Sequence, residues 1–119
     1  MQSRFRGKFQ ALIAAVLEGR GDSAPSLRHA AARRAAQLAG LGKGEVDAGA
    51  ALPDALRAYV DKVALHAYKV LDRDVEHLLE ESYTQDAVFE LTISTALGAA
   101  RARLARGLEL LNREEGKCD

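Results

Sequence analysis

The fold of this chain is decided by residues 85–113, which read QDAVFELTISTALGAARARLARGLELLNR. Within this stretch, apolar and small residues recur at the three- and four-residue spacing of one helical face. They are Val88/Phe89, Thr92/Ile93, Ala96/Leu97, Ala100, Leu104, Leu108 and Leu111. Thr84 stands just before them, where an N-cap is expected. The pattern predicts one long helix from Gln85 to Arg113 that begins at a threonine cap.

Two glycines, Gly98 and Gly107, lie inside this predicted helix. Each lowers helix stability by about 1 kcal/mol relative to alanine. A glycine is favoured inside a helix where a second backbone crosses closely, and it is also tolerated on an alanine-rich surface. From the sequence the two interpretations are equally good.

The same spacing predicts two helices at the N-terminal end of the chain. The apolar residues of the first are Phe5, Phe9, Leu12, Ile13, Val16 and Leu17. Gly19 follows them and ends that helix. The second helix starts at a cap on Asp22 or Ser23, carries Pro25 in its first turn and ends at Gly40.

Two more helices are predicted between the N-terminal pair and the long helix. One begins at Pro53 or Asp54 and has an apolar stripe at Leu56, Val60, Val63, Ala67 and Val70. The other is short, is capped by Asp72 and closes at Ser82 and Tyr83. Residues 40–52 are rich in Gly and Ala and have no period, which predicts a loop.

The composition predicts one all-α domain of about five helices. The chain has 119 residues, only 5% aromatic residues and two prolines, which disfavours a sheet and leaves room for one core. Residues 1–119 are therefore predicted to form a single domain. Its parts are an N-terminal helical pair over 4–39, the loop over 40–52 and a helical core over 53–113.

Charge and cysteine content exclude several classes of function. Lys and Arg together number 17, as do Asp and Glu, so the basic excess of a nucleic-acid-binding protein is missing. The apolar run at 11–17 is too short for a signal peptide or a membrane span, which predicts a cytoplasmic protein that does not enter membranes. Cys118 is the one cysteine, which excludes an intramolecular disulfide.

The histidines are the first residues to consider for catalysis or metal binding. His29, His66 and His77 are too far apart along the chain to share a metal at helical spacing, so no metal site is predicted. His66 follows Lys62 by one helical turn, and histidine is a residue type that can accept and donate protons, which suits acid–base chemistry. A half-buried histidine that only donates or accepts a hydrogen bond explains the same position.

Two clusters of basic residues are candidates for binding a phosphate or an acidic partner. Their members are Arg28, Arg33 and Arg34 in one cluster, and Arg101, Arg103 and Arg106 in the other. Because acidic residues balance them over the whole chain, a solvated basic face is the favoured interpretation.

About half of the chain resembles a known family. The segments that carry the resemblance are AYVDKVALHAYKV (58–70), DRDV (72–75), YTQD (83–86), FELT (89–92) and ALGAA (96–100), followed by Arg103-Leu104 and Gly107-Leu108. This order resembles the carboxymuconolactone decarboxylase or alkylhydroperoxidase-D-like (AhpD-like) superfamily. The resemblance implies an all-α fold that assembles as a homo-oligomer, commonly a trimer or hexamer.

The resemblance also implies a comparison with the redox members of the family. Those members carry a Cys-x-x-Cys pair whose second cysteine lies four residues before the family's histidine. When His66 is matched to that histidine, the two cysteine positions fall on Tyr59 and Lys62. A phenol and an ammonium cannot form the disulfide that peroxide reduction needs. The family's upstream acid would fall near Glu45 or Asp47. The chain is therefore expected not to be a thiol peroxidase.

Three functional hypotheses follow. In the first, the chain is a cytoplasmic AhpD-like homo-oligomer without redox cysteines. In the second, it is a small acid/base enzyme that acts on an anionic small molecule. His66 would then transfer protons, Lys62 and Tyr59 would hold the ligand, and Glu90 would orient His66. In the third, it is a non-catalytic helical module that binds itself or another protein. None of the three calls for a cofactor, a nucleic acid or a membrane.

Overall fold

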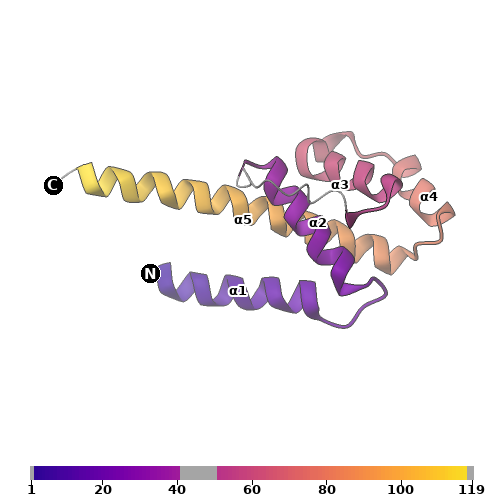
Figure 1. Ribbon diagram of the computed structural model, residues 1–119, viewed down its shortest axis with the longest axis horizontal. Coiled ribbons are helices and arrows are strands. Elements are labelled where there is room, and N and C mark those ends of the chain that lie inside the picture. The colour runs from indigo at the N-terminus through magenta and orange to yellow at the C-terminus, as the bar shows by residue number, and fades with distance from the viewer. Residues whose placement is uncertain (1, 41–50, 118–119) are drawn as a thin grey trace.

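The protein is helical throughout the part that the computed structural model describes (Figure 1). The structure describes the backbone of residues 2–40 and 51–117 and the side chains of residues 5–40 and 51–113. The helices are α1 (Gln2–Glu18), α2 (Pro25–Leu38), α3 (Asp54–His66), α4 (Asp72–Glu80) and α5 (Gln85–Lys117), with a 3-10 helix, η2 (Ala67–Lys69), after α3. The predicted all-α class and the long C-terminal helix are confirmed. Most of the predicted 40–52 loop lies outside the described residues, as do Glu45, Asp47 and Cys118.

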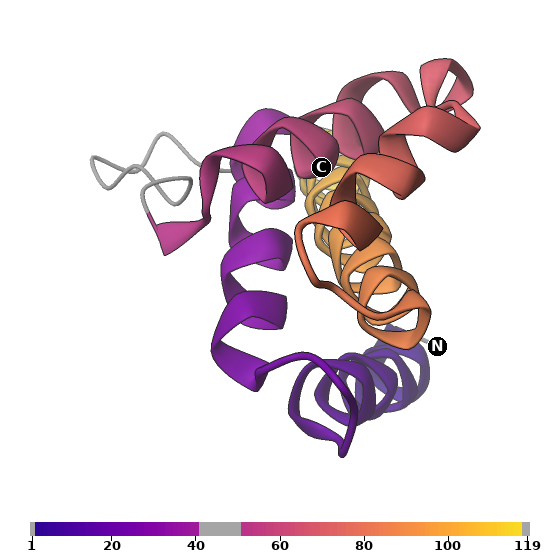
Figure 2. The same cartoon turned by 90° about the vertical axis from the view of Figure 1, so that its right-hand side faces the viewer.

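The centre of the fold is the crossing of α2 over the first half of α5, which is the largest contact between any two described helices. Figure 2 looks along α5 and shows α3 on one side of this crossing and α1 on the other. The core between α2, α3 and α5 is built from Ala30, Ala31, Leu52, Leu56, Tyr59, Val60, Leu78, Val88 and Leu91. The second predicted helix thus packs mainly on the C-terminal helix and less on the first.

Gly98 is the reason that α2 and α5 approach so closely. A Cβ atom on Gly98 would overlap the backbone carbonyl of Ala32 on α2, so any side chain there would push the two helices apart. Gly107 has no atom within 4 Å of such a Cβ position. Of the two interpretations open from the sequence, the close crossing is correct for Gly98 and the surface glycine for Gly107.

The molecule is elongated, with extents of 58 × 27 × 25 Å. In Figure 1, α1 and the C-terminal half of α5 run antiparallel and project from one end of the packed helices. We call α1 and residues 103–113 of α5 the arms. We call residues 25–38 and 51–102 the head.

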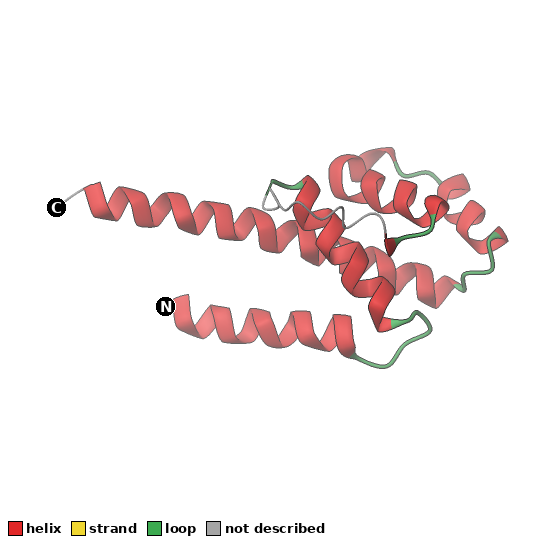
Figure 3. Ribbon diagram, viewed as in Figure 1, coloured by secondary structure: helices red, strands yellow, loops and turns green. Residues whose placement is uncertain are grey.

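Figure 3 shows where the helices end and the turns begin. The hydrogen bonds at these ends differ in part from the predicted caps. Thr84 caps α5 as predicted, since its Oγ1 accepts the Ala87 N–H at 3.0 Å. The predicted cap of α2 is wrong: the N-cap is Ala24, without a side-chain bond. Ser23 does not cap because its hydroxyl donates to Glu90 at 2.6 Å.

The ends of α3 and α4 also depart from the sequence pattern. α3 stops at His66, although the apolar stripe continues to Val70, because the His66 backbone leaves the helical region at φ −143° and ψ 53°. The 3-10 turn that follows still brings Val70 against the core. α4 has Leu71 rather than Asp72 as its N-cap, and Asp74 accepts the Leu71 N–H at 2.7 Å.

The buried face of α5 differs from the predicted stripe. Leu91, Ser94 and Thr95 are fully buried, whereas Phe89 and Leu111 are 63% and 58% exposed. The two buried hydroxyls are satisfied, because each donates at 2.7 Å to the carbonyl four residues earlier. Leu111 is exposed because it lies on the arm, beyond the reach of the head.

Candidate functional site

Tyr59, the first of the predicted site residues, lies in the core. Its ring is 7% exposed and its hydroxyl lies 2.8 Å from Thr92 Oγ1. Because Thr92 donates its own proton to the Val88 carbonyl at 2.6 Å, Tyr59 is the donor to Thr92. The phenol of Tyr59 is therefore committed to a bond between α3 and α5.

Lys62 lies one turn further along α3 and forms an ion pair with α4. Its Nζ is 3.0 and 3.1 Å from the two carboxylate oxygens of Asp74. The backbone N–H of Leu71 and the ammonium of Lys62 together hold the pKa of Asp74 below its usual value. The charge of Lys62 is thus balanced within the fold.

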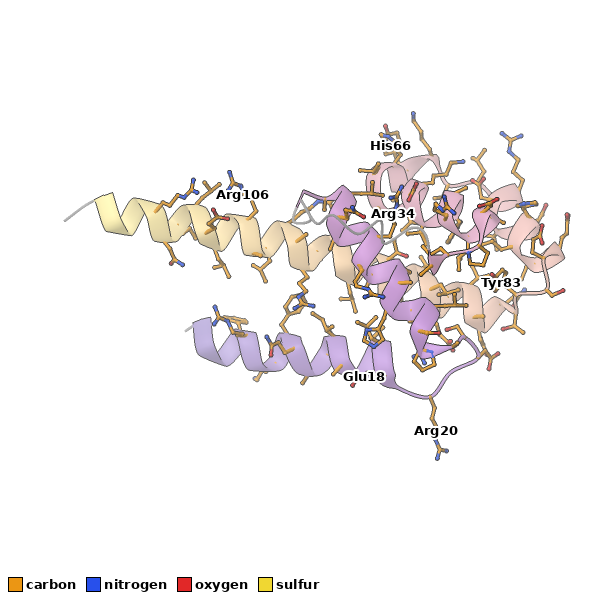
Figure 4. The ribbon with its side chains drawn as sticks, viewed as in Figure 1. Glu18, Arg20, Arg34, His66, Tyr83 and Arg106 are labelled. Carbon is orange, nitrogen blue, oxygen red and sulfur yellow. The ribbon has the colours of Figure 1, made fainter. Side chains whose placement is uncertain are left out.

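His66 ends α3 at an exposed position, on the outer side of the head (Figure 4). Its ring meets that of Tyr68 edge to face, with the centroids 6.0 Å apart. Tyr59, Lys62 and His66 share one helix, but each contacts a different partner, namely Thr92, Asp74 and Tyr68.

Glu90, the fourth predicted residue, organises the turn between α1 and α2. Its carboxylate accepts the N–H groups of Asp22 and Ser23 at 2.9 and 2.8 Å, and the Ser23 hydroxyl at 2.6 Å. Partial burial by itself raises the pKa of Glu90. These hydrogen bonds and the charge of Arg28 outweigh it and hold the pKa below its usual value. The structure gives Glu90 partners in this turn, whereas His66 packs on Tyr68.

Arg28 is the largest departure from the predicted basic face. Its side chain is 2% exposed, and its guanidinium donates to the carbonyls of Val16 at 2.7 Å and Gly19 at 2.6 Å. These carbonyls belong to the C-terminal end of α1, where a helix leaves acceptors unpaired and favours a positive charge. Arg28 therefore fixes α1 to α2, and its assignment to a solvated face was wrong.

Most of the other clustered arginines also have partners within the fold. Arg34 forms a two-pronged ion pair with Asp61 at 2.8 and 2.9 Å. Arg103 donates to the Ala64 carbonyl at 3.1 Å, and Arg106 lies 3.2 Å from Glu109.

Arg33 and Arg101 are different from the rest of the two clusters. Both are exposed, and within residues 5–40 and 51–113 neither has a hydrogen-bond or ion-pair partner. The fold places these two residues, from α2 and α5, beside the same cavity.

That cavity has a volume of about 190 Å³ and lies where α1, α2 and α5 meet. Its polar lining is Arg33, Arg101 and His29. Its apolar lining is Ile13, Leu17, Ala32, Ala36, Leu97 and Gly98. Sequence reasoning missed this site because its residues come from three helices; the paired arginine clusters were the one signal that pointed toward it.

Large apolar side chains are exposed on both the arms and the head. On the arms they are Phe5, Leu12, Leu104, Leu110 and Leu111, and on the head they are Leu65, Tyr68, Leu71 and Phe89. These side chains range from 45% to 79% exposed.

Charge is unevenly distributed along the chain, although the total is zero. Residues 1–40 contain seven Lys or Arg and two Asp or Glu, whereas residues 51–100 contain four Lys or Arg and nine Asp or Glu. The exposed acids of the head include Asp72, Glu76, Glu80 and Glu81 on and next to α4. The arms carry the exposed bases Arg6, Lys8, Arg103, Arg106 and Arg113.

Within the described residues, no group of three or more His, Cys, Asp or Glu is arranged to hold a metal ion. No described helix is both long enough and apolar enough to cross a membrane. The chain matches no protein-family model, no curated protein and no solved structure.

Proposed function

We propose that the protein is an AhpD-like, non-peroxidatic helical module that associates with further copies of itself, the arms of one copy binding the head of the next. The observation that carries this proposal is the pairing of exposed apolar residues with opposite charge on the arms and the head. The cytoplasmic location stays a prediction.

The apolar residues supply the driving force for such a contact. Side chains such as Phe5 and Leu111 on the arms and Tyr68 and Phe89 on the head are each more than half exposed. Burying a large apolar side chain is worth about 1.5 to 3 kcal/mol. Exposed apolar patches of this kind are typical of protein interaction sites.

The charges select which surfaces meet. Two basic arms repel each other, and so do two copies of the acidic segment on and next to α4, whereas an arm and this segment of the head attract. A contact between two different surfaces of the same chain closes into a ring when the rotation between copies allows it. A ring agrees with the trimers or hexamers that the family resemblance implies.

The family part of the proposal is supported by the segments from Ala58 to Gly107. Its non-peroxidatic part is supported by Tyr59 and Lys62, which stand where the family's redox members have cysteines. In the structure these two side chains bond to Thr92 and Asp74.

Sedimentation velocity on the full chain tests the self-association. We expect oligomers at about 100 µM that dissociate on dilution or when salt is raised from about 0.05 to 0.5 M, because salt screens the contact between arms and head. An arm variant, Leu104→Gln with Leu111→Gln, and a head variant, Glu80→Lys with Glu81→Lys, should each be monomeric. Arg20→Gln, on an exposed residue of the α1–α2 turn, is the matched control and should assemble like the unaltered chain.

Mixing the two variants identifies the kind of contact. The arm variant keeps an intact head and the head variant keeps intact arms, so an equimolar mixture should form a one-to-one complex. If either variant still assembles on its own, the contact joins like surfaces and the arm-to-head arrangement is wrong. A mixture that stays monomeric also overturns that arrangement. A monodisperse monomer for the unaltered chain at about 100 µM overturns self-association itself, since this corresponds to a binding free energy weaker than about −5.5 kcal/mol.

A further inference from the structure

We propose that the cavity between α1, α2 and α5 binds a compact organic monocarboxylate, whose carboxylate is held by Arg33 and Arg101 and whose apolar body fills the space above Gly98. This site shares α1 with the arms, through Ile13 and Leu17, but the inference does not rest on self-association.

The shape of the cavity follows from the small residues at the helix crossing. Gly98 and Ala32 bring the backbones of α5 and α2 together, and Ala36 adds no bulk one turn further along α2. Larger residues would fill this space with their own side chains. Ile13 and Leu17 of α1 and Leu97 of α5 close the remaining sides with apolar surface.

The charge of the cavity depends on which arginines of the two clusters are already paired within the fold. The other arginines of the two clusters donate to carbonyls or carboxylates of the fold, but Arg33 and Arg101 have no such partner within the described side chains. A guanidinium is a planar donor that matches a carboxylate with two parallel hydrogen bonds. Two such groups at one apolar cavity therefore favour an anion with an apolar body.

His29 forms the remaining polar wall of this site. The Nε2 atom of His29 lies 4.0 Å from a carboxylate oxygen of Glu18, which is itself 68% exposed. The histidine is thus directed to Glu18, and the two arginines remain as the anion contacts. The apolar lining favours an organic carboxylate over inorganic phosphate, which has no apolar body to fill the cavity.

The volume limits the size of the ligand. An apolar cavity of about 150 Å³ accommodates benzene. A cavity of about 190 Å³ therefore has room for one ring or a short branched chain with a carboxylate at the rim. Benzoate is the simplest probe of this chemistry.

Titration of the full chain with benzoate, followed by backbone amide NMR, tests the proposal. We expect saturable shifts at the amides around Ala32, Ala36 and Gly98, complete within about 20 mM benzoate. Benzamide has the same ring without the charge, and acetate has the charge without the ring. Both should bind at least tenfold more weakly, and so should inorganic phosphate.

Substitutions of the lining residues test the contribution of the arginine charges and that of the free volume separately. Arg33→Gln and Arg101→Gln should each weaken benzoate binding about tenfold, in line with the loss of one charged hydrogen-bonding group. Ala36→Leu should block binding by filling the space. Arg73→Gln, an exposed arginine of α4, should leave the affinity unchanged. Circular dichroism of each variant checks that the helices remain.

Three results would overturn the inference. One is the absence of saturable benzoate binding. The second is equal binding of benzamide, which would indicate an apolar cavity without anion recognition. The third is benzoate binding that survives the Arg33→Gln, Arg101→Gln double variant, which would place the anion elsewhere.

Discussion

The backbone of Gly98 on α5 lies directly against the carbonyl of Ala32 on α2, with no room for a Cβ atom between them. This contact sets the spacing of the two helices that make the largest interface of the fold. It also forms the floor of the cavity that Arg33 and Arg101 flank.

The two glycines of α5 should respond in opposite ways to alanine. Gly98→Ala forces α2 away from α5 and should lower the free energy of unfolding by about 2 to 3 kcal/mol. Gly107→Ala meets open space and should raise it by up to about 1 kcal/mol, because alanine favours the helix. Urea denaturation of the two variants measures both changes. Equal effects would contradict the close crossing.

Arg28 should be essential for the docking of α1. Arg28→Met keeps much of the apolar stem but leaves the Val16 and Gly19 carbonyls without their donor, which should cost about 2 to 3 kcal/mol. Hydrogen exchange should speed up along α1 and much less at the α2–α5 crossing. Arg33→Met, on an exposed arginine of the same helix, should change the free energy of unfolding by less than about 0.5 kcal/mol. Similar losses for both arginines would refute this role.

Glu90 should make the stability depend on pH in the acidic range. Its pKa is lower in the folded chain than in the unfolded one, so its contribution is complete above about pH 4.3, the ordinary pKa of a glutamate. It is lost as the pH falls through the folded-state value. At pH 7, Glu90→Gln should lower the free energy of unfolding by about 1 to 3 kcal/mol, since the amide cannot accept all three hydrogen bonds.

The difference in the free energy of unfolding between the unaltered chain and Glu90→Gln reports on Glu90 alone. The contribution of Asp74, whose pKa is also lowered, is the same in both proteins and cancels. That difference should shrink steadily as the pH is reduced below 4.3 in thermal or urea unfolding. Glu76→Gln, an exposed carboxylate of α4, should give a small difference that does not vary with pH. A constant difference for Glu90→Gln would show that its carboxylate is not the group responsible.

Thiol-dependent peroxide reduction should be absent. Under the proposed family relationship, Tyr59 and Lys62 stand at the positions of the two thiols of the redox members. In the structure their side chains bond to Thr92 and Asp74. An assay that couples peroxide loss to thiol oxidation should show the same background rate for the unaltered chain and for Cys118→Ser. Turnover that persists in Cys118→Ser would require a different reductive chemistry and would refute the prediction.

The helices and several of their ends could be predicted because they depend on neighbours in the chain. The long helix α5 and its Thr84 cap depend on local features and were predicted correctly, whereas the buried face of α5 was not. The break at His66 was not visible, because the 3-10 turn keeps Val70 on the core side and so preserves the apolar period.

The candidate sites could not be predicted because they depend on partners far along the chain. Arg28, Arg33 and Arg34 are one residue type on one helix, yet the first binds α1, the last binds Asp61, and Arg33 borders the cavity. From the sequence, Ser23 is expected to cap a helix. In the structure its hydroxyl donates instead to Glu90, which lies 67 residues later in the chain. Such assignments require knowing which helices cross and where.

The bond between Glu90 and the α1–α2 turn has a consequence for the order of assembly during folding. The turn has its hydrogen-bonding partner only after α5 has reached α2, so in a nascent chain that lacks α5 the bonds from Arg28 hold α1 without the support of Glu90. Closing a loop of this length costs entropy that the α2–α5 crossing has to offset first. We therefore expect α1 to dock last when the chain folds and to detach first when it unfolds.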